Sequence, residues 1–183
     1  WSAGRIDIKD SDLRLQDFEG ANTQGHFNKL SFNGNRLQKI SEAVSFYAGV
    51  SGQLASKNLD VSEKMELGGM YGIRAYPEGE GFGDEGYVIT LESRLQLKDL
   101  ASDLPGQMQL IGFIDAGAIF ANHKKWAVGD NRRYLSGAGL GLNWGRAQDF
   151  MVRAYYAIKL GNETAKSAPD AQGRFWIQAV KYF

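Results

Sequence analysis

Apolar residues recur at every second position over segments of ten residues or more, and this period constrains the fold more than any other feature. The clearest example is 87–97, where one face carries Tyr87, Ile89, Leu91, Leu95 and Leu97. The opposite face carries Val88, Thr90, Glu92, Arg94 and Gln96. A strand sorts side chains in this way because successive residues point to opposite faces, whereas a helix spreads them around its circumference.

Eight segments are predicted strands on this basis, and most are about 11 to 13 residues long. They are 3–15, 25–37, 43–55, 86–98, 108–120, 134–144, 150–160 and 173–183. Strands of globular proteins usually have about 5 or 6 residues, whereas a tilted strand that crosses a membrane needs roughly 9 to 11. The lengths therefore favour a membrane β-barrel over a soluble sandwich.

The predicted connections alternate in length along the chain. The turns at 38–43 and 145–149 are short, and the turn at 99–107 is intermediate. Long polar stretches cover 56–85, 121–133 and 161–172. Short turns at one end and long loops at the other are typical of an outer-membrane barrel, with the long loops outside the cell. The sequence thus predicts an all-β, antiparallel transmembrane β-barrel domain whose chain ends in the periplasm.

Composition excludes several other classes of protein. The 21 basic and 21 acidic residues balance, which gives no sign of a nucleic-acid partner, and the absence of cysteine excludes disulfides and thiol chemistry. No run reaches the roughly 18 to 20 apolar residues of a membrane helix. The sequence has no signal peptide and begins at Trp1, so we expect it to be part of a longer precursor.

No motif indicates catalysis or a cofactor. The glycines of 137–141 and 79–83 lack the spacing and the flanking residues of nucleotide-binding loops, and those of 137–141 are expected to leave room for an inserted loop. His26 and His123 are isolated, so no metal site is predicted. No serine lies in a nucleophile-elbow pattern. We therefore predict no enzyme activity and no cofactor.

The block 52–97 contains short motifs in a specific order. They are Gly52-Gln53, Asn58-Leu59-Asp60, Ser62-Glu63-Lys64, Leu67-Gly68-Gly69, Ile73-Arg74-Ala75-Tyr76-Pro77 and Gly83-Asp84-Glu85-Gly86. This block resembles the two-partner secretion transporters, the haemolysin secretion/activation family. The resemblance implies a barrel of sixteen strands, of which residues 1–183 would supply the last eight. Two periplasmic POTRA domains and the first eight strands would precede them.

By the same resemblance, the loop at 56–85 folds back into the pore, and its arginine pairs with an aspartate on the barrel wall. Arg74 and Asp115 are the candidates, with Ile73 and Tyr76 beside the arginine and Ala75 where the family has glycine. The phase of 108–120 supports Asp115, because the apolar residues occupy even positions there and an odd position then faces the lumen. We expect lumenal water to screen this pair partly.

Further residues receive roles from the resemblance or from the strand phase. Gly68, Gly69, Asp84 and Gly86 belong to the loop motif. The residues expected to line a wet pore are Glu92, Arg94, Arg153 and Lys159. The terminal Phe183 is the expected signal for the barrel assembly machinery, although Lys181 replaces the aromatic residue common two positions earlier.

The function that the resemblance implies is export of one dedicated exoprotein of the adhesin or haemolysin type, carrying an N-terminal secretion domain, across the Gram-negative outer membrane. An outer-membrane protein insertase of the same superfamily is one alternative, and a passive porin or a barrel enzyme is another. A soluble all-β binding domain is a third, which the long strands disfavour. The pieces at 58–60 and 62–64 favour the secretion branch.

Overall fold

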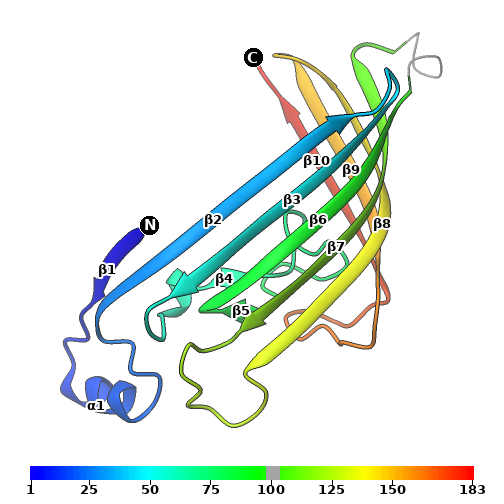
Figure 1. The fold of residues 1–183 in the computed structure, drawn as a ribbon. Helices are drawn as coiled ribbons and strands as arrows, with labels where there is room; N and C mark the ends of the chain where they lie inside the picture. The colour runs from blue at the N-terminus through cyan, green and yellow to red at the C-terminus, as the bar shows by residue number, and fades with distance from the viewer. Residues whose placement is uncertain (98–103) are drawn as a thin grey trace.

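The computed structural model describes residues 1–97 and 104–183, and most of its strands form one curved antiparallel sheet, with β4 and β5 pairing separately (Figure 1). The sheet has eight strands in the order β1-β2-β3-β6-β7-β8-β9-β10. Their bounds are β1 Ser2–Ile6, β2 Gly25–Lys39, β3 Val44–Ala55, β6 Glu85–Gln96, β7 Gln107–Phe120, β8 Arg132–Arg146, β9 Phe150–Lys159 and β10 Gly173–Lys181. The antiparallel sheet and its long strands confirm the predicted fold class.

The first predicted strand, 3–15, is wrong over most of its length. Only β1 is extended there, and helix α1 follows at Ser11–Glu19. Asp10 caps this helix, because its carboxylate accepts hydrogen bonds from the backbone N–H groups of Asp12 (2.9 Å) and Leu13 (3.0 Å). The alternation in this segment was too short to outweigh a helix-capping residue.

Smaller differences occur at other strand ends. Residue 98 and most of the expected turn at 99–107 lie outside the described residues. The last strand ends at Lys181, so Phe183 lies beyond it with its side chain fully exposed. Its proposed role as an assembly signal stays a prediction.

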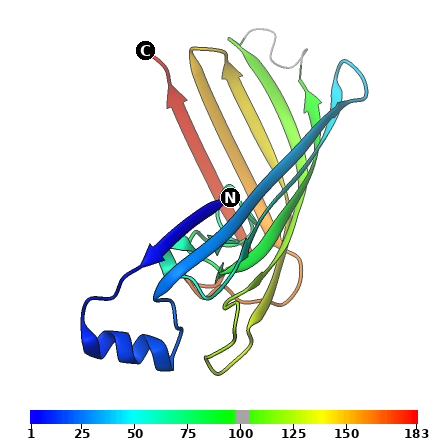
Figure 2. The same cartoon turned by 60° about the vertical axis from the view of Figure 1, so that its left-hand side comes forward.

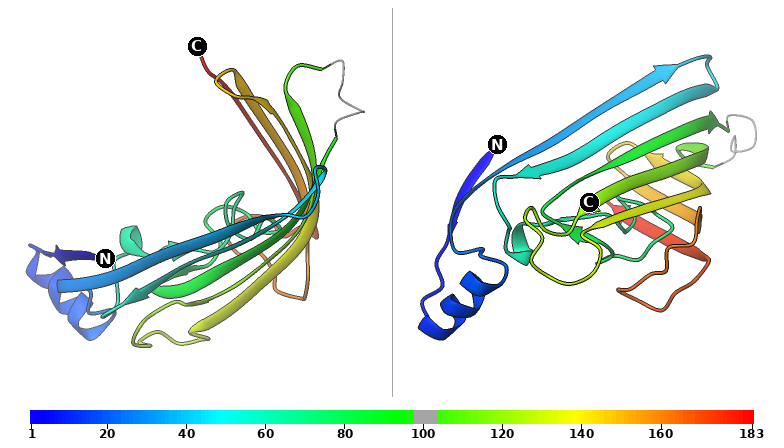
Figure 3. Two further views of the ribbon diagram at one scale, coloured as in Figure 1. Left: turned by 45° about the horizontal axis from the view of Figure 1, so that its top comes forward. Right: turned by 60° about the horizontal axis from the view of Figure 1, so that its bottom comes forward.

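The two faces of the sheet differ as the alternation predicts. Residues on the outer, convex face include exposed Leu91, Leu110 and Ile114, whereas Val88 and Asp115 on the inner face are buried. Figures 2 and 3 show the sheet curving around the segment 56–84, which lies on its concave side. The hydrophobic core is formed between this segment and the inner face of β6 to β9.

The long connections gather at one end of the sheet and the short turns at the other (Figure 1). Helix α1 lies at the end with the long connections, as do the loops that follow β7 and β9. The segment 56–84 starts and ends there too, and contains the 3-10 helix η1 Val61–Glu63 and the strands β4 Met65–Glu66 and β5 Phe82–Gly83. Among the described residues, no helix is long and apolar enough to span a membrane.

Candidate functional site

The segment 56–84, called the pore loop below, is folded tightly enough to fix the direction of its arginine. The backbone N–H of Ile73 donates to the carbonyl of Leu67 (2.7 Å), and that of Gly69 donates to the carbonyl of Tyr76 (3.1 Å). Gly69 has a positive φ of 99°, and a Cβ at Gly68 would lie 2.1 Å from the carbonyl oxygen of Pro77. Gly69 is thus required by its backbone conformation, and Gly68 by the close approach of the backbone at Pro77.

Arg74 leaves this turn and binds Asp115 on β7 through two parallel hydrogen bonds. Its Nε donates to Oδ2 and its Nη2 donates to Oδ1, both at 2.8 Å. The backbone N–H of Arg74 also donates to Oδ2 (3.1 Å), and Thr90 Oγ1 donates to Oδ1 (3.0 Å). The planar guanidinium and the carboxylate match in geometry, so the pair fixes both position and orientation.

Glu92 on β6 is a second carboxylate partner of Arg74. Its Oε1 accepts from Nη1 at 2.9 Å, and its Oε2 is 2.7 Å from Arg94 Nη2. The guanidinium carbon lies 3.4 Å from the ring centroid of Phe113 and 5.1 Å from that of Tyr155, so aromatic rings contact the cation as well. Glu92 borders the concave-side hollow together with Arg94 and Arg153, as expected of a residue that faces the lumen, but its side chain is only 7% exposed.

The expectation that water screens the Arg74–Asp115 pair is wrong. The side chain of Arg74 is 5% exposed and that of Asp115 is fully buried. A buried ion pair of this kind adds little to the stability of the fold compared with an apolar contact. Removing one partner, however, leaves the other charge buried and unpaired, which costs about 3–5 kcal/mol of stability. The pair therefore holds the loop in place because the alternative, an unpaired buried charge, is much less stable.

Ala75 fits the site through a matching glycine on the wall. A Cβ added at Gly137 on β8 would lie 2.4 Å from the methyl carbon of Ala75, so the wall leaves room for the loop at this point. Gly139 and Gly141 provide room in the same way for the rings of Phe113 and Tyr155. Ala75 has no positive φ, so alanine at the family's glycine position causes no backbone strain here.

Ile73 and Tyr76 both lie in the core, fully buried beside Arg74. The hydroxyl of Tyr76 donates to the carbonyl of Glu163 (3.1 Å). Lys159 Nζ lies 5.0 Å from the centroid of the Tyr76 ring and pairs with Asp170. Lys159 is buried under the loop 160–172, so the expectation that its side chain lines a wet pore is wrong.

Arg94 and Arg153 are partly exposed and face the concave side. They line a hollow of about 320 Å³ that also borders Arg74, Tyr71 and Asn143. Trp176 on the last strand, β10, donates its Nε1–H to the carbonyl of Arg74 (2.7 Å), which connects the loop tip to the far side of the sheet. No motif pointed to Trp176, because its partner is a backbone atom.

Asp84, at the end of the pore loop, joins three segments near the end with the long connections. Its fully buried carboxylate accepts from the backbone N–H groups of Leu59 (3.1 Å) and His123 (2.8 Å) and pairs with Lys64 (2.7 Å). Gly86 lies two residues later, at a position where a Cβ would be 2.4 Å from the carbonyl oxygen of Ala118 on β7. These contacts explain why the motif needs aspartate and glycine at these positions.

Asn58 fastens the start of the pore loop to two other loops. Its side-chain amide donates to the carbonyls of Ala21 (2.7 Å) and Lys124 (3.0 Å), and its Oδ1 accepts from the N–H of Lys124 (2.6 Å). Asp60 then caps η1 by accepting from Ser62 N (3.0 Å). Asn58 and Asp60, the two polar residues of the Asn-Leu-Asp motif, thus hold the pore loop in shape and do not contact Arg74.

Glu80 is a further buried acidic residue, which the sequence analysis did not single out. It accepts hydrogen bonds from Lys166 N (2.8 Å), Ser167 N (2.9 Å) and Ser167 Oγ (2.9 Å), and it pairs with Arg133 on β8. Burial raises the pKa of this carboxyl, but these hydrogen bonds outweigh it, so the pKa lies below its ordinary value. Glu80 thereby fastens the pore loop to the loop 160–172, and we call these contacts the Glu80 clasp.

The fold and the site together define a class of protein. Long antiparallel strands with an exposed apolar outer face, and an inward loop whose arginine binds two wall carboxylates, are the wall and pore loop of an outer-membrane β-barrel. The family model described as haemolysin secretion/activation protein ShlB/FhaC/HecB matches residues 9–144. The chain belongs to this family, whose members lie in the Gram-negative outer membrane, and membership in a transporter family confirms that it is not an enzyme.

Individual relatives agree with this assignment. The chain is 26% identical over 169 residues to the heme/hemopexin transporter protein HuxB of Haemophilus influenzae strain 86-028NP, covering 92% of this chain and 29% of the relative. It is 25% identical over 181 residues to HuxB of strain ATCC 51907, covering 98% of this chain and 31% of that protein. The chain thus spans less than a third of the length of these relatives.

Solved structures show the same fold. CdiB from Escherichia coli superimposes with a TM-score of 0.71 at 18% identity, over 90% of this chain and 29% of that one. CdiB from Acinetobacter baumannii gives a TM-score of 0.60 at 20% identity, over 87% of this chain and 28% of that one. In both, the similarity covers part of a larger barrel protein.

Proposed function

We propose that the protein containing this chain exports one dedicated exoprotein across the outer membrane by two-partner secretion. The observation that carries the proposal is the buried Arg74–Asp115 pair, which holds the pore loop against the inner wall of the sheet. Family membership and the relatives named as transporters support it. The partner would be a large adhesin-like or haemolysin-like protein with an N-terminal secretion domain.

The proposed protein is larger than this chain. An upstream half of the barrel and periplasmic POTRA domains would complete it, which agrees with the 29–31% share of the HuxB relatives that the chain covers. Phe183, exposed after β10, would serve recognition by the barrel assembly machinery. In the text below, this complete protein is called the parent transporter.

The pore loop would act as a latched element in this transporter, with Arg74, Asp115, Ile73 and Tyr76 forming the latch and Glu92 reinforcing it. Three hydrogen-bond donors of the Arg74 side chain are used by the two carboxylates. A lysine at this position would keep the charge but not the planar fork that binds both. The loop would therefore hold one position in the lumen, which sets the space left for an extended exoprotein chain.

Secretion of the exoprotein by cells that express the parent transporter tests this proposal. We expect Arg74→Ala to reduce the exoprotein in the medium at least severalfold, and Arg74→Lys to restore it only in part. Arg153→Ala is the matched control, because Arg153 is another arginine on the concave side but does not bind Asp115. All variants should insert in the outer membrane at similar levels.

Three results would contradict the proposal or part of it. Export that does not depend on an inserted transporter would remove the secretion function, and a general loss of other outer-membrane barrels on its deletion would favour an insertase. Normal export by both Arg74 variants and by Asp115→Ala, at normal protein levels, would remove the latch alone. The experiment thus tests the function and the mechanism separately.

A further inference from the structure

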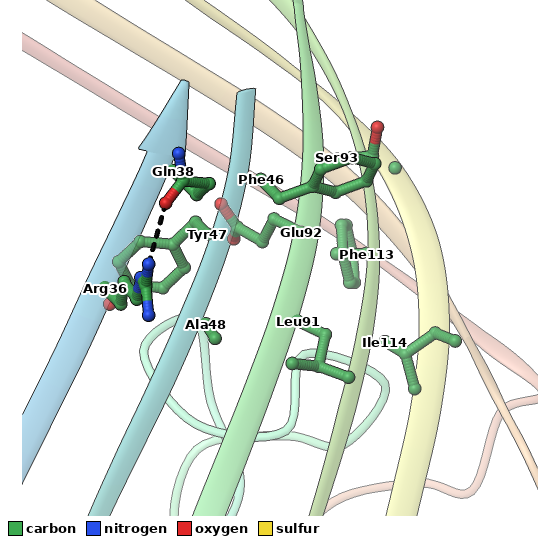
Figure 4. Close-up of a pocket in the computed structure, with 11 residues that line it drawn as sticks. Arg36, Gln38, Phe46, Tyr47, Ala48, Leu91, Glu92, Ser93, Phe113 and Ile114 are labelled. Carbon is green, nitrogen blue, oxygen red and sulfur yellow. Dashed lines mark hydrogen bonds between the residues drawn. The ribbon is translucent and has the colours of Figure 1, made fainter. Parts of the chain in front are cut away.

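The outer face of the sheet carries two polar residues next to an apolar surface. Arg36 and Gln38 on β2 pair in register with Ala48 and Phe46 on β3, so their side chains lie on the convex face. Arg36 Nη2 donates to Gln38 Oε1 at 2.9 Å (Figure 4). Both side chains are exposed, and neither belongs to the pore-loop site.

A hollow of about 480 Å³ lies beside this pair. Small residues on three neighbouring strands form its floor, namely Ala48, Ser93 and Gly112. Larger apolar side chains form its walls, namely Phe46, Leu91 and Ile114. The register places all six on the outer face, as it does Arg36 and Gln38, so the hollow opens mainly toward lipid. Tyr47, Glu92 and Phe113, which alternate with these residues along the strands, also border it. Its volume and apolar lining suit part of an acyl chain.

An arginine on this surface needs an explanation, because a charge that faces lipid is costly at the membrane centre. For a barrel, this cost is greatest at the midplane and becomes small near the interfaces. Arg36 lies three residues from the end of β2, where the short turn to β3 begins. It is therefore placed at the interface that adjoins the short turns, where phosphate groups lie.

The charge of Arg36 is not neutralised within the part of the chain that the structure describes. The bond to Gln38 uses one of its N–H donors, and no acidic side chain among the described residues pairs with it. A guanidinium offers five donors in a planar arrangement that matches a phosphate group. Arg36 thus presents an unpaired cation at one edge of an apolar hollow.

We propose that this hollow is a binding site for a glycerophospholipid of the periplasmic leaflet. Its phosphate would bind Arg36, with Gln38 holding the guanidinium in place, and one acyl chain would lie over Ala48, Ser93 and Gly112. The periplasmic leaflet is chosen because Arg36 lies at the end with the short turns, which in outer-membrane barrels face the periplasm. The proposal does not depend on export or on the latch.

Native mass spectrometry of the purified parent transporter tests the proposal, with phosphatidylglycerol as the probe. We expect wild-type protein to retain one phosphatidylglycerol after mild delipidation, and Arg36→Gln to bind it at least about tenfold more weakly. Gly112→Leu should have a similar effect because it fills the hollow. A Cβ at Gly112 meets only Leu140 Cδ2, at 3.7 Å, so this substitution causes no clash at the backbone.

Two matched controls separate a built site from the general lipid belt. Arg132→Gln removes another arginine of the outer face, at the end with the long loops, where Arg132 stacks on Tyr134 (4.2 Å). Gly34→Leu adds the same side chain outside the hollow, where a Cβ meets only Val50 Cγ1 at 3.8 Å. Both controls should retain phosphatidylglycerol as the wild type does.

The proposal is overturned if Arg36→Gln and Gly112→Leu retain the lipid as well as wild type, or if the controls lose it equally. Equal retention of an uncharged diacylglycerol would show that the phosphate is not recognised. Preferential retention of lipopolysaccharide, lost in the Arg36 variant, would place the site in the wrong leaflet. Reduced export with unchanged lipid binding would concern the proposed transport function and not this site.

Discussion

At the residue scale, the contact between Ala75 and Gly137 predicts that a substitution at one residue destabilises the protein and that a second substitution at the other restores its stability. In Gly137→Ala, the new methyl group would lie 2.4 Å from that of Ala75, so the loop tip must move away from the wall. Overpacking of this kind costs about 1–3 kcal/mol. We expect the variant to unfold at a lower temperature and its pore loop to become sensitive to protease.

Adding Ala75→Gly to the same variant should restore stability, because it removes the methyl group that causes the clash. Limited proteolysis of the parent transporter, with thermal unfolding beside it, measures both steps. Ala75→Gly alone is the control and should have a small effect. If the double variant is as protease-sensitive as Gly137→Ala, the two residues are not in contact in the folded protein.

The sequence predicted some of these residue contacts and missed others, for a physical reason. The Arg74–Asp115 pair was implied by the resemblance to the secretion transporters, and the phase of one strand supported Asp115 as the partner. The roles of Glu92 and Glu80 depend on where the pore loop runs over the wall, which no local pattern encodes. The alternation of β6 correctly placed Glu92 on the inner face. Its burial could not be predicted, because it results from the pore loop that folds over it.

At the scale of elements, the Glu80 clasp connects the pore loop to the loop 160–172 and predicts a dependence on pH. Hydrogen bonds to its carboxylate hold the pKa of Glu80 below its ordinary value of 4.5. A lowered pKa in the folded state means that the clasp contributes stability above about pH 4.5 and loses it as pH falls through the folded pKa. Lys159 holds the pKa of Asp170 low in the same loop, so both groups weaken in the same direction.

Hydrogen exchange of the parent transporter, pulsed at different pH values and corrected for intrinsic rates, measures this effect. We expect the backbone N–H groups of Lys166 and Ser167, which donate to Glu80, to lose protection below pH 4.5. Glu80→Gln should lower their protection at neutral pH and reduce its change with pH. Constant protection across the range in the wild type would contradict the prediction.

Among the elements, the strands were predictable and α1 was not. Long alternating segments predicted the long strands of the sheet, because burial of one face and exposure of the other impose a period of two on the sequence. The segment that became α1 has no buried residue, so no tertiary face imposed a pattern on it. Capping by Asp10 favours a helix there, so a strand prediction based on the alternation of apolar residues was wrong for this segment.

At the scale of the whole molecule, the sheet is open, since β1 and β10 each pair on one side only in the part of the chain that the structure describes. Unpaired N–H and C=O groups at such edges cannot be satisfied in lipid, and closure of the barrel is the general solution. The curvature seen in Figure 3 is that of part of a barrel wall. Within the proposed parent transporter, further strands would pair with both edges.

This reasoning predicts how residues 1–183 behave when expressed alone. We expect the segment to give no monomer that resists heat and protease in bilayers, because two strand edges remain unpaired, whereas co-expression with the upstream part of the parent should restore one. Residues 1–183 contain no cysteine, so a cysteine introduced at Gln178 or Ala179 on β10 is the single thiol of this segment, and its cross-linking to a cysteine on the first barrel strand reports closure. A protected monomer formed by the segment alone would mean that its eight strands close on themselves. The pore loop would then have to fit into a lumen narrower than the one that the curvature of the open sheet implies.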